Sequence, residues 1–267
     1  MSSKIYDNIN YSSDISYLTN TFIYEYDISK ANINILYTKG IIDKTTYDHL
    51  YNSPRMTRQK YIGMLQKDKE VVKLLKDGII EAKKMLFEAN NIQDYEVLSV
   101  KNDAVFIINR KLKVTEFGLI NFVCKNVYTS YYKIGYLELY YYFNNVNNNE
   151  YLHVKGISDE KIELHNEYMM SFIKDVFYSV QINGVEIAIR MLKDFYMQYI
   201  TLALPIGYYR QFNSSSTFHF KFISKMGTGF ELDNATEEMK QDIDITYNIS
   251  ILLNLQKILA SMYFTKH

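Results

Sequence analysis

The alternation of apolar and polar residues predicts a pair of short strands near the middle of the chain. Val97–Lys101 and Ala104–Ile108 are rich in β-branched and aromatic residues, and only Asn102 and Asp103 separate them. Two such runs joined by two Asn or Asp residues are typical of a β-hairpin. Because both linking residues tolerate the left-handed backbone conformation, we expect a type I′ turn that presents the Asp103 carboxylate at its tip.

Upstream of this hairpin, the pattern predicts one more strand followed by helices. Residues 22–28 are expected to form a strand that ends near Asp27. Apolar residues at helical spacing over 31–36 predict a short helix behind it, with Ser29 as its cap. Further helices are expected from about residue 43, over 57–65 and over 68–89, where Gly78 marks a candidate break.

The pattern changes from strand to helix after residue 157. Strands rich in aromatic residues are expected over 117–123, 128–143 and 151–157. Helices are expected over about 159–179, 184–203 and 236–263, with an irregular aromatic stretch at 205–232. The simplest division is a loose lead-in at 1–20, an α+β domain at 21–157 and a mainly helical part at 158–267.

Composition and charge narrow the class of protein. The chain has 267 residues, of which 48% are hydrophobic and 22% charged, as in an ordinary globular protein. A net charge of zero argues against a protein whose whole surface coats nucleic acid. Between Arg55 and Lys84, however, nine basic residues face four acidic ones, an excess of five. This segment is either a solvated helix face or a basic interaction surface.

The cysteine and histidine content excludes two kinds of site. Cys124 is the one cysteine, so neither a disulfide framework nor a cysteine-based zinc site can form. The five histidines show no zinc-binding spacing. The first residues lack the apolar core of a signal peptide, and no run approaches 18 apolar residues. We therefore expect a soluble intracellular protein without a membrane partner.

Two acids offer the sharpest chemical hypothesis. Asp27 at a strand end and Asp103 on the hairpin would meet in one sheet, where their carboxylates and the Ile28 carbonyl can bind Mg²⁺ or Mn²⁺. Nucleotidyl transfer needs such hard oxygen ligands for its metal ions. Arg58 and Lys60 lie between the two acids and would contact a triphosphate. The alternative is structural, because acids are common at strand ends and turns.

The residues around both acids resemble motifs of the family B DNA polymerases. Tyr26–Leu36 resembles the first palm motif, D-x-x-S-L-Y-P-S-I-I, in its aspartate and in the apolar run after it. Leu98–Ile107 is similar to the palm hairpin Y-G-D-T-D-S-x-F, with Asp103 in place of the second, metal-binding aspartate. Arg58–Gly63 is similar to the fingers helix, and Val154–Ile157 to the K-G-I/x segment between palm and thumb.

The chain also departs from the family pattern. Lys30 replaces the family serine, Asn32 replaces the tyrosine that screens the sugar, and Lys101 replaces the first aspartate of D-T-D. The interval between Asp27 and Asp103 leaves little room for full fingers. The resemblance, in order and rough spacing, extends across residues 24–160, and it implies a minimal or diverged palm of viral origin.

The resemblance implies a fold and an activity. The fold would be α+β, with a palm-like, mostly antiparallel sheet and a mainly helical, thumb-like C-terminal part. The activity would be metal-dependent nucleotidyl transfer from a nucleoside triphosphate to a nucleic-acid end, in the cytoplasm of an infected host. Asp27 and Asp103 would be the catalytic metal ligands, with Lys155 on the primer or template backbone.

Further nucleic-acid contacts are expected from basic residues near aromatic ones. Lys133 lies among the tyrosines of 131–142 and Lys125 precedes them; these tyrosines could stack on bases or could be ordinary strand positions. Arg210 belongs to a polar, aromatic cluster at 208–213. The alternative function is a non-catalytic nucleic-acid-binding or assembly protein that retains a degenerate polymerase-like core and binds nucleic acid or a partner protein.

Overall fold

The chain forms two compact units. The computed structural model describes residues 4–144, 146–147, 149–157, 162–163, 165–211, 221–225, 229–231 and 236–266. Unit 1 consists of Met1–Ile15 and Thr21–Tyr128, and unit 2 consists of Ser16–Asn20 and Thr129–His267. These units are not the three regions expected from the sequence, and those domain boundaries stay predictions. Each unit has its own hydrophobic core.

Eight of the described strands form one sheet, which together with the helices confirms the expected α+β class. Its order is β1-β3-β4-β2-β6-β7-β8, with β5 paired to β6. The strands are β1 (Asn10–Ser12), β2 (Tyr17–Ile28), β3 (Val97–Lys101), β4 (Ala104–Ile108), β5 (Glu116–Phe117), β6 (Ile120–Ile134), β7 (Leu137–Asn144) and β8 (Asn149–Lys155). The pairs β1–β3, β3–β4, β2–β4, β6–β7 and β7–β8 are antiparallel, as expected.

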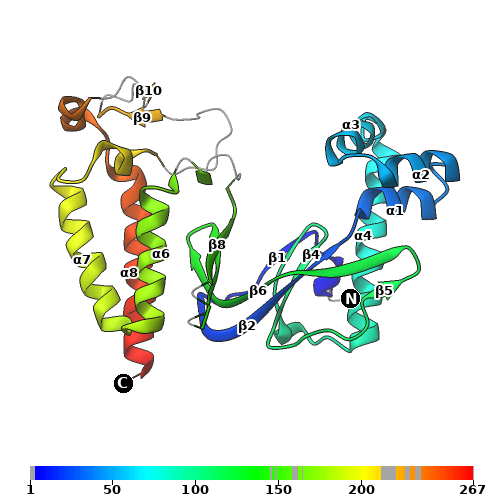
Figure 1. Ribbon diagram of the computed structural model, residues 1–267, viewed down its shortest axis with the longest axis horizontal. Coiled ribbons are helices and arrows are strands. Elements are labelled where there is room, and N and C mark those ends of the chain that lie inside the picture. The colour runs from blue at the N-terminus through cyan, green and yellow to red at the C-terminus, as the bar shows by residue number, and fades with distance from the viewer. Residues whose placement is uncertain are drawn as a thin grey trace. The chain divides into compact units, whose positions relative to one another are not determined.

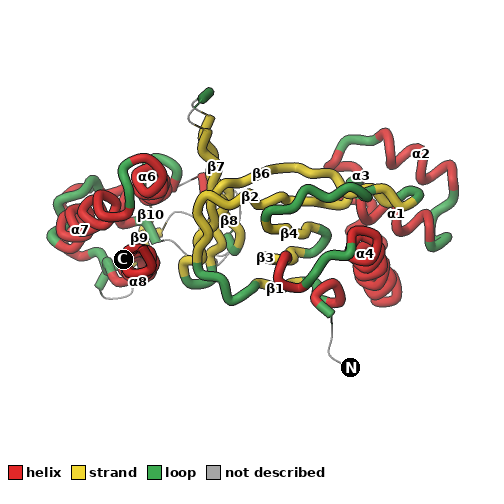
Figure 2. Tube along the Cα trace, turned by 90° about the horizontal axis from the view of Figure 1, so that it is seen from below, coloured by secondary structure: helices red, strands yellow, loops and turns green. Residues whose placement is uncertain are grey.

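The predicted hairpin is confirmed, but its turn is not of type I′. Lys101 pairs with Ala104, so two residues connect β3 to β4, which lie beside β1 in Figure 2. Of these two residues only Asn102 has a positive φ, 57°, whereas a type I′ turn requires positive φ at both. The Asn102 N–H donates to the carbonyl of Ile9 at 2.7 Å, which ties the turn to the segment before β1.

The helices of unit 1 lie where the sequence predicts helices. They are α1 (Ala31–Thr38), α2 (Lys44–Asn52), α3 (Arg55–Leu65) and α4 (Lys69–Asn90), and the first three gather at one end of α4 in Figure 1. Asp43 caps α2 and Asp68 caps α4, each by accepting a backbone N–H bond. A short 3₁₀ helix, Asp94–Glu96, precedes β3.

Ser29 does not cap α1, contrary to the sequence-based expectation. Lys30 takes the N-cap position in the left-handed conformation, with φ 51° and no side-chain cap bond. The Ser29 N–H instead bonds the carbonyl of Asn121 at 2.8 Å, which continues the pairing of β2 with β6. The chain therefore turns sharply from strand to helix at Lys30.

Two further expectations for unit 1 are wrong. Gly78 does not break α4; a Cβ there would lie 2.4 Å from Cγ2 of Ile35, so the glycine lets α1 pack closely on α4. The N-terminal residues are packed rather than loose, because Ile5 and Tyr6 of the 3₁₀ helix Ile5–Asp7 are buried. The Tyr6 ring meets Phe87 of α4 edge-on, with ring centroids 5.7 Å apart.

Unit 2 packs three helices against β6, β7 and β8. These helices are α6 (Met169–Ile182), α7 (Val185–Ile200) and α8 (Thr246–Lys266), which lie side by side in Figures 1 and 2. Its core includes Tyr132 of β6 stacked on Phe177 of α6, with ring centroids 3.8 Å apart. The remaining described elements are the 3₁₀ helices Ile206–Tyr209 and Glu237–Asp242 and the strand pair Lys221–Ile223 and Gly229–Glu231.

The predicted helices of unit 2 begin or end differently from the expected ranges. Residues 236–245, expected to be helical, contain a 3₁₀ helix and an isolated bridge before α8 starts at Thr246. The expected start near residue 159 lies outside the described residues. Among the described residues, no helix combines the length and apolarity that crossing a membrane requires.

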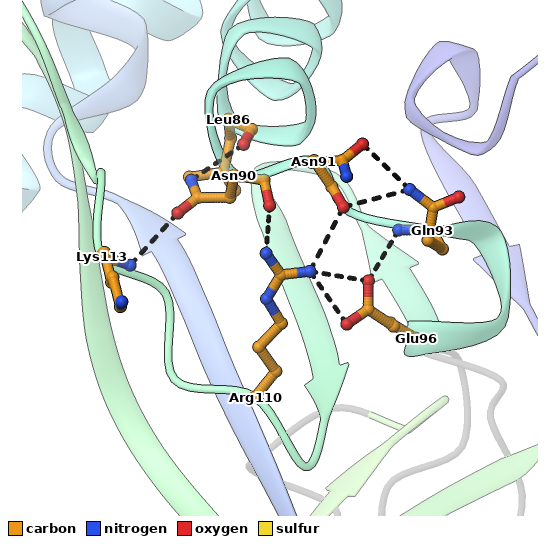
Figure 3. Close-up of polar contacts among 7 residues, drawn as sticks. All are labelled: Leu86, Asn90, Asn91, Gln93, Glu96, Arg110 and Lys113. Atoms are coloured by element: carbon orange, nitrogen blue, oxygen red, sulfur yellow. Dashed lines mark hydrogen bonds and ion pairs between the residues drawn. The ribbon is translucent and has the colours of Figure 1, made fainter.

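A polar network joins the end of α4 to the segment that follows β4 (Figure 3). The buried Asn90 side chain donates to the carbonyls of Leu86 and Val114 and accepts from the N–H groups of Lys113 and Val114. Arg110 donates to both Glu96 carboxylate oxygens at 2.9 Å. Arg110 also donates to the carbonyls of Asn90 and Asn91 at the end of α4. The network therefore caps the C-terminus of the helix and holds the segment after β4 against it.

We expect Asn90→Ala to lower the free energy of unfolding by about 1–2 kcal/mol, because it leaves partly buried backbone groups without partners. Urea denaturation measures this change. The matched control is Asn52→Ala, whose exposed amide bonds only a carbonyl of its own helix and which should change stability by less than about 0.5 kcal/mol. Equal effects of the two substitutions would contradict this role for Asn90.

Candidate functional site

One cavity of unit 1 brings together most of the residues that the sequence singles out. Its volume is about 410 Å³. It is lined by residues from the end of β2, the start of α1, α3, the hairpin turn and β6. Five of the predicted site residues contribute to it, namely Asp27, Ile28, Arg58, Asp103 and Lys125.

Asp27 is the most buried acid of this cavity. It faces Ala104 across the β2–β4 pair, next to the hairpin turn, and is 8% exposed. The Lys125 ammonium forms an ion pair with its Oδ2 atom. Its Oδ1 atom is buried and has no hydrogen-bond partner among the described residues. A buried carboxylate oxygen without a donor is costly, so this atom is suited to receive a cation.

Asp103 lies at the hairpin tip beside Asp27. Its backbone carbonyl accepts the Ile28 N–H at 3.3 Å, which ties the tip of the hairpin to the end of β2. Because Asp27 pairs with the next residue of the hairpin, Ala104, the two acids belong to adjacent positions of paired strands. The register therefore supplies two carboxylates and the Ile28 backbone to the same cavity.

Lys83 of α4 is a buried cation that acts electrostatically on Asp103. It is completely buried, and its ammonium donates to the carbonyl of Asn8. Burial lowers the pKa of Lys83 to about 8, and the nearby charges of Asp7 and Asp103 partly offset this effect. The Asp103 carboxylate is thus attracted by a buried lysine of α4, whose burial the charge pattern of the basic segment does not indicate.

The rest of the cavity is rich in positive charge. Lys30, Arg55, Arg58 and Lys125 line it against the two acids, which gives an excess of two positive charges. The start of α1 also lines it, and helix N-termini favour anions. Arg58 donates to the carbonyl of Ser53 at 2.5 Å. Lys30 donates to the carbonyl of Tyr51 at 2.9 Å, so both cations bond carbonyls at the C-terminal end of α2.

Glu25 is a further buried acid, missed by the sequence analysis. It lies two residues before Asp27 in β2, and therefore on the same face of the sheet, and is 4% exposed. Its carboxylate accepts hydrogen bonds from the Tyr128 hydroxyl at 2.5 Å and the Asn126 amide at 2.7 Å. The spacing Glu25-x-Asp27 indicates that both acids lie on one face of the strand. The burial of Glu25 could not be predicted, because its partners on β6 are about a hundred positions away in the sequence.

The other predicted contacts lie outside this cavity. Lys60 is exposed on α3 and is not part of the lining, whereas Arg55, five positions earlier, is. Lys133 and Lys155 pair with Glu138 of β7 from its two neighbouring strands, so both flank one buried carboxylate. Their roles in binding substrate and nucleic acid stay predictions.

Arg210 is buried in unit 2. It is 5% exposed, its guanidinium lies 6.0 Å from the ring centroid of Tyr168, and its carbonyl accepts from the Asn248 amide at 2.7 Å. Burial lowers the pKa of His165 to about 3, and the charge of Arg210 acts in the same direction. A nucleic-acid contact by Arg210, which stays a prediction, would require its guanidinium to become exposed.

Most tyrosines of the tyrosine-rich strands β6 and β7 pack inside the protein. Tyr131, Tyr132, Tyr140 and Tyr141 are fully buried, so the alternative of ordinary strand positions holds for these four. Tyr142 stacks on Tyr151 across β7 and β8, with ring centroids 4.8 Å apart. Tyr136 is 55% exposed, and base stacking by it stays a prediction.

The two carboxylates of the cavity offer the oxygen ligands that a divalent cation prefers, although they are only two. Among the described residues, no group of three or more His, Cys, Asp and Glu side chains could hold a metal ion. The candidate set is therefore the two carboxylates with the Ile28 carbonyl. The donorless Oδ1 of Asp27 is the observation that favours a cation there.

One protein family matches almost the whole chain. The family model described as "Bacteriophage PBS1 gene 130 protein" matches residues 1–261. No curated protein matches the chain significantly. The description of the family states a phage source and no activity.

The buried Lys83 predicts a pH dependence of stability. The pKa of Lys83 in the folded state is below its ordinary value of 10.5. Its burial therefore lowers the free energy of unfolding most below pH 8, where the ammonium is charged, and not at all well above pH 10.5. The free energy of unfolding of the wild type, relative to Lys83→Met, should therefore rise by about 1–2 kcal/mol between pH 7 and 9.5. Urea denaturation at both pH values measures the difference.

The control for this experiment is Lys76→Met, which replaces an exposed lysine of the same helix. Its stability should follow that of the wild type across the same pH interval. If the free energies of unfolding of Lys83→Met and the wild type changed equally with pH, burial of the charged Lys83 ammonium would not destabilise the fold.

Proposed function

We propose that this chain, which belongs to the Bacteriophage PBS1 gene 130 protein family, is a metal-dependent nucleotidyltransferase that acts on a nucleic-acid end. The observation that carries the proposal is that Asp27, Asp103 and Arg58 line one cavity, although 76 positions separate the two acids. A phage family agrees with the expected viral origin. Action in the host cytoplasm is part of the proposal.

The cavity residues have separate roles in this proposal. Asp27, Asp103 and the Ile28 carbonyl would hold Mg²⁺ or Mn²⁺, which supplies positive charge to the attacking and leaving oxygens. Arg58, with Arg55 in the place expected for Lys60, would bind the triphosphate through guanidinium N–H groups. The first N–H groups of α1 add donors for the same phosphates.

A polymerase-like palm is the finer form of the proposal. The strand order supports it, because β2, which carries the first motif, lies directly beside β4 of the hairpin that carries the second. The helices α1 to α4 occupy the interval between the two motifs. The thumb-like role of the C-terminal helices, and the primer contact of Lys155, remain part of the proposal.

Substitution of the acids tests the activity. Asp103→Asn and Asp27→Asn should each lower magnesium-dependent incorporation of labelled nucleotide into a primer by at least about 100-fold, because each removes a charged metal ligand. Asp103→Asn should leave the thermal melt nearly unchanged. The control is Asp48→Asn, an exposed acid of α2 outside the cavity, which should retain wild-type incorporation. Incorporation that survives Asp103→Asn would refute the site.

The second candidate is a non-catalytic nucleic-acid-binding or assembly protein. The cationic excess of the cavity and the basic segment from Arg55 to Lys84 favour it, because neither feature needs a metal to bind phosphates. A gel-shift assay over a salt series, with and without chelator, separates the two candidates. Binding that weakens with salt and is unchanged by the chelator, without nucleotide incorporation, would favour the second candidate. The full chain would then be used to search for a partner protein.

A further inference from the structure

Lys125 is placed where it would compete with a metal ion. Its ammonium contacts Oδ2 of Asp27, and both residues line the 410 Å³ cavity together with Asp103. A divalent cation bound by Asp27 would need the same carboxylate. Two cations cannot share that carboxylate closely without strong repulsion, because like charges a few ångströms apart repel even in a polar medium.

The exposure of the two partners is unequal. The Lys125 side chain is 54% exposed, whereas that of Asp27 is 11% exposed. The ammonium can therefore move into solvent on its flexible stem at small cost, while the carboxylate stays in the sheet. An ion pair whose lysine is largely exposed contributes little to stability, so a metal ion can exchange with it.

The surroundings of Asp27 make a counter-charge necessary. Glu25 lies on the same face two residues away, and its carboxylate is occupied by Tyr128 and Asn126. Among the described residues, Lys125 is the ion-pair partner of Asp27, and the other carboxylate oxygen has no donor. Without Lys125 or a metal ion, the buried Asp27 carboxylate would lose the ion pair that offsets its charge.

We propose that Lys125 is a built-in stand-in for the divalent cation: it neutralises Asp27 until the metal binds, and metal binding displaces it. The inference rests on the proposed metal site and adds how that site is regulated. Metal affinity is then lowered by the lysine, and the fold does not need metal to tolerate the buried acid. Lys125, expected from the sequence to contact nucleic acid, acts first on Asp27.

The test is Mn²⁺ binding to the full chain, measured by titration calorimetry or electron paramagnetic resonance. Lys125→Met should bind Mn²⁺ on the order of 3–10-fold more tightly than the wild type, since the competing ammonium is gone. Lys125→Arg, which keeps the charge, should stay near the wild type. The matched control is Lys39→Met, which breaks an ion pair with Glu81 outside the cavity and should leave Mn²⁺ affinity unchanged.

A second readout guards against a merely structural effect. Without divalent ions, Lys125→Met should melt at a lower temperature than the wild type, because Asp27 loses its counter-charge. Added Mn²⁺ should raise its melting temperature by more than it raises that of the wild type. A variant that lost only packing would show the first change without the second.

The outcomes separate this inference from the proposed function. If Asp27→Asn abolishes Mn²⁺ binding but Lys125→Met binds with wild-type affinity, the stand-in role is overturned and the metal site is kept. If Lys125→Met binds more tightly even when combined with Asp27→Asn, the metal lies elsewhere and the inference fails. If neither the wild type nor any variant binds Mn²⁺, the metal site is overturned and the inference falls with it.

Discussion

The register between β2 and β4 is the constraint on which the site depends. Asp27 faces Ala104, and the Ile28 N–H bonds the carbonyl of Asp103, so the first acid lies beside the hairpin tip. A shift of one residue would turn Asp27 into the hydrophobic core of unit 1 and bring Tyr26 and Ile28 out of it. That core, packed under α1 and α4, therefore fixes the position of the acids.

Buried charge is the second theme of unit 1. Glu25, Asp27 and Lys83 are each less than 10% exposed, and each is compensated differently. Glu25 accepts two hydrogen bonds, Asp27 has an ion pair with Lys125, and Lys83 bonds a backbone carbonyl near acidic groups. Only Asp27 keeps a buried oxygen without a donor, which distinguishes a candidate binding group from groups that merely satisfy the fold.

Local signals explain what the sequence could predict. The hairpin and the helices α2 to α4 follow from turn residues, caps and apolar periodicity, all of which act over a few positions. The left-handed Lys30, the bonds from β6 to Glu25 and the pairing of Lys125 with Asp27 depend on residues about a hundred positions apart or on tertiary packing. Likewise, charge alone could not separate the buried Arg210 from an exposed arginine.

The most direct measurement is the position of the metal itself. A crystal of the wild-type chain soaked in Mn²⁺ should give an anomalous peak about 2.0–2.5 Å from oxygens of both Asp27 and Asp103, with the Lys125 ammonium moved away. A peak elsewhere, or an Asp27 carboxylate still paired with Lys125 at saturating Mn²⁺, would contradict a shared metal at these two acids.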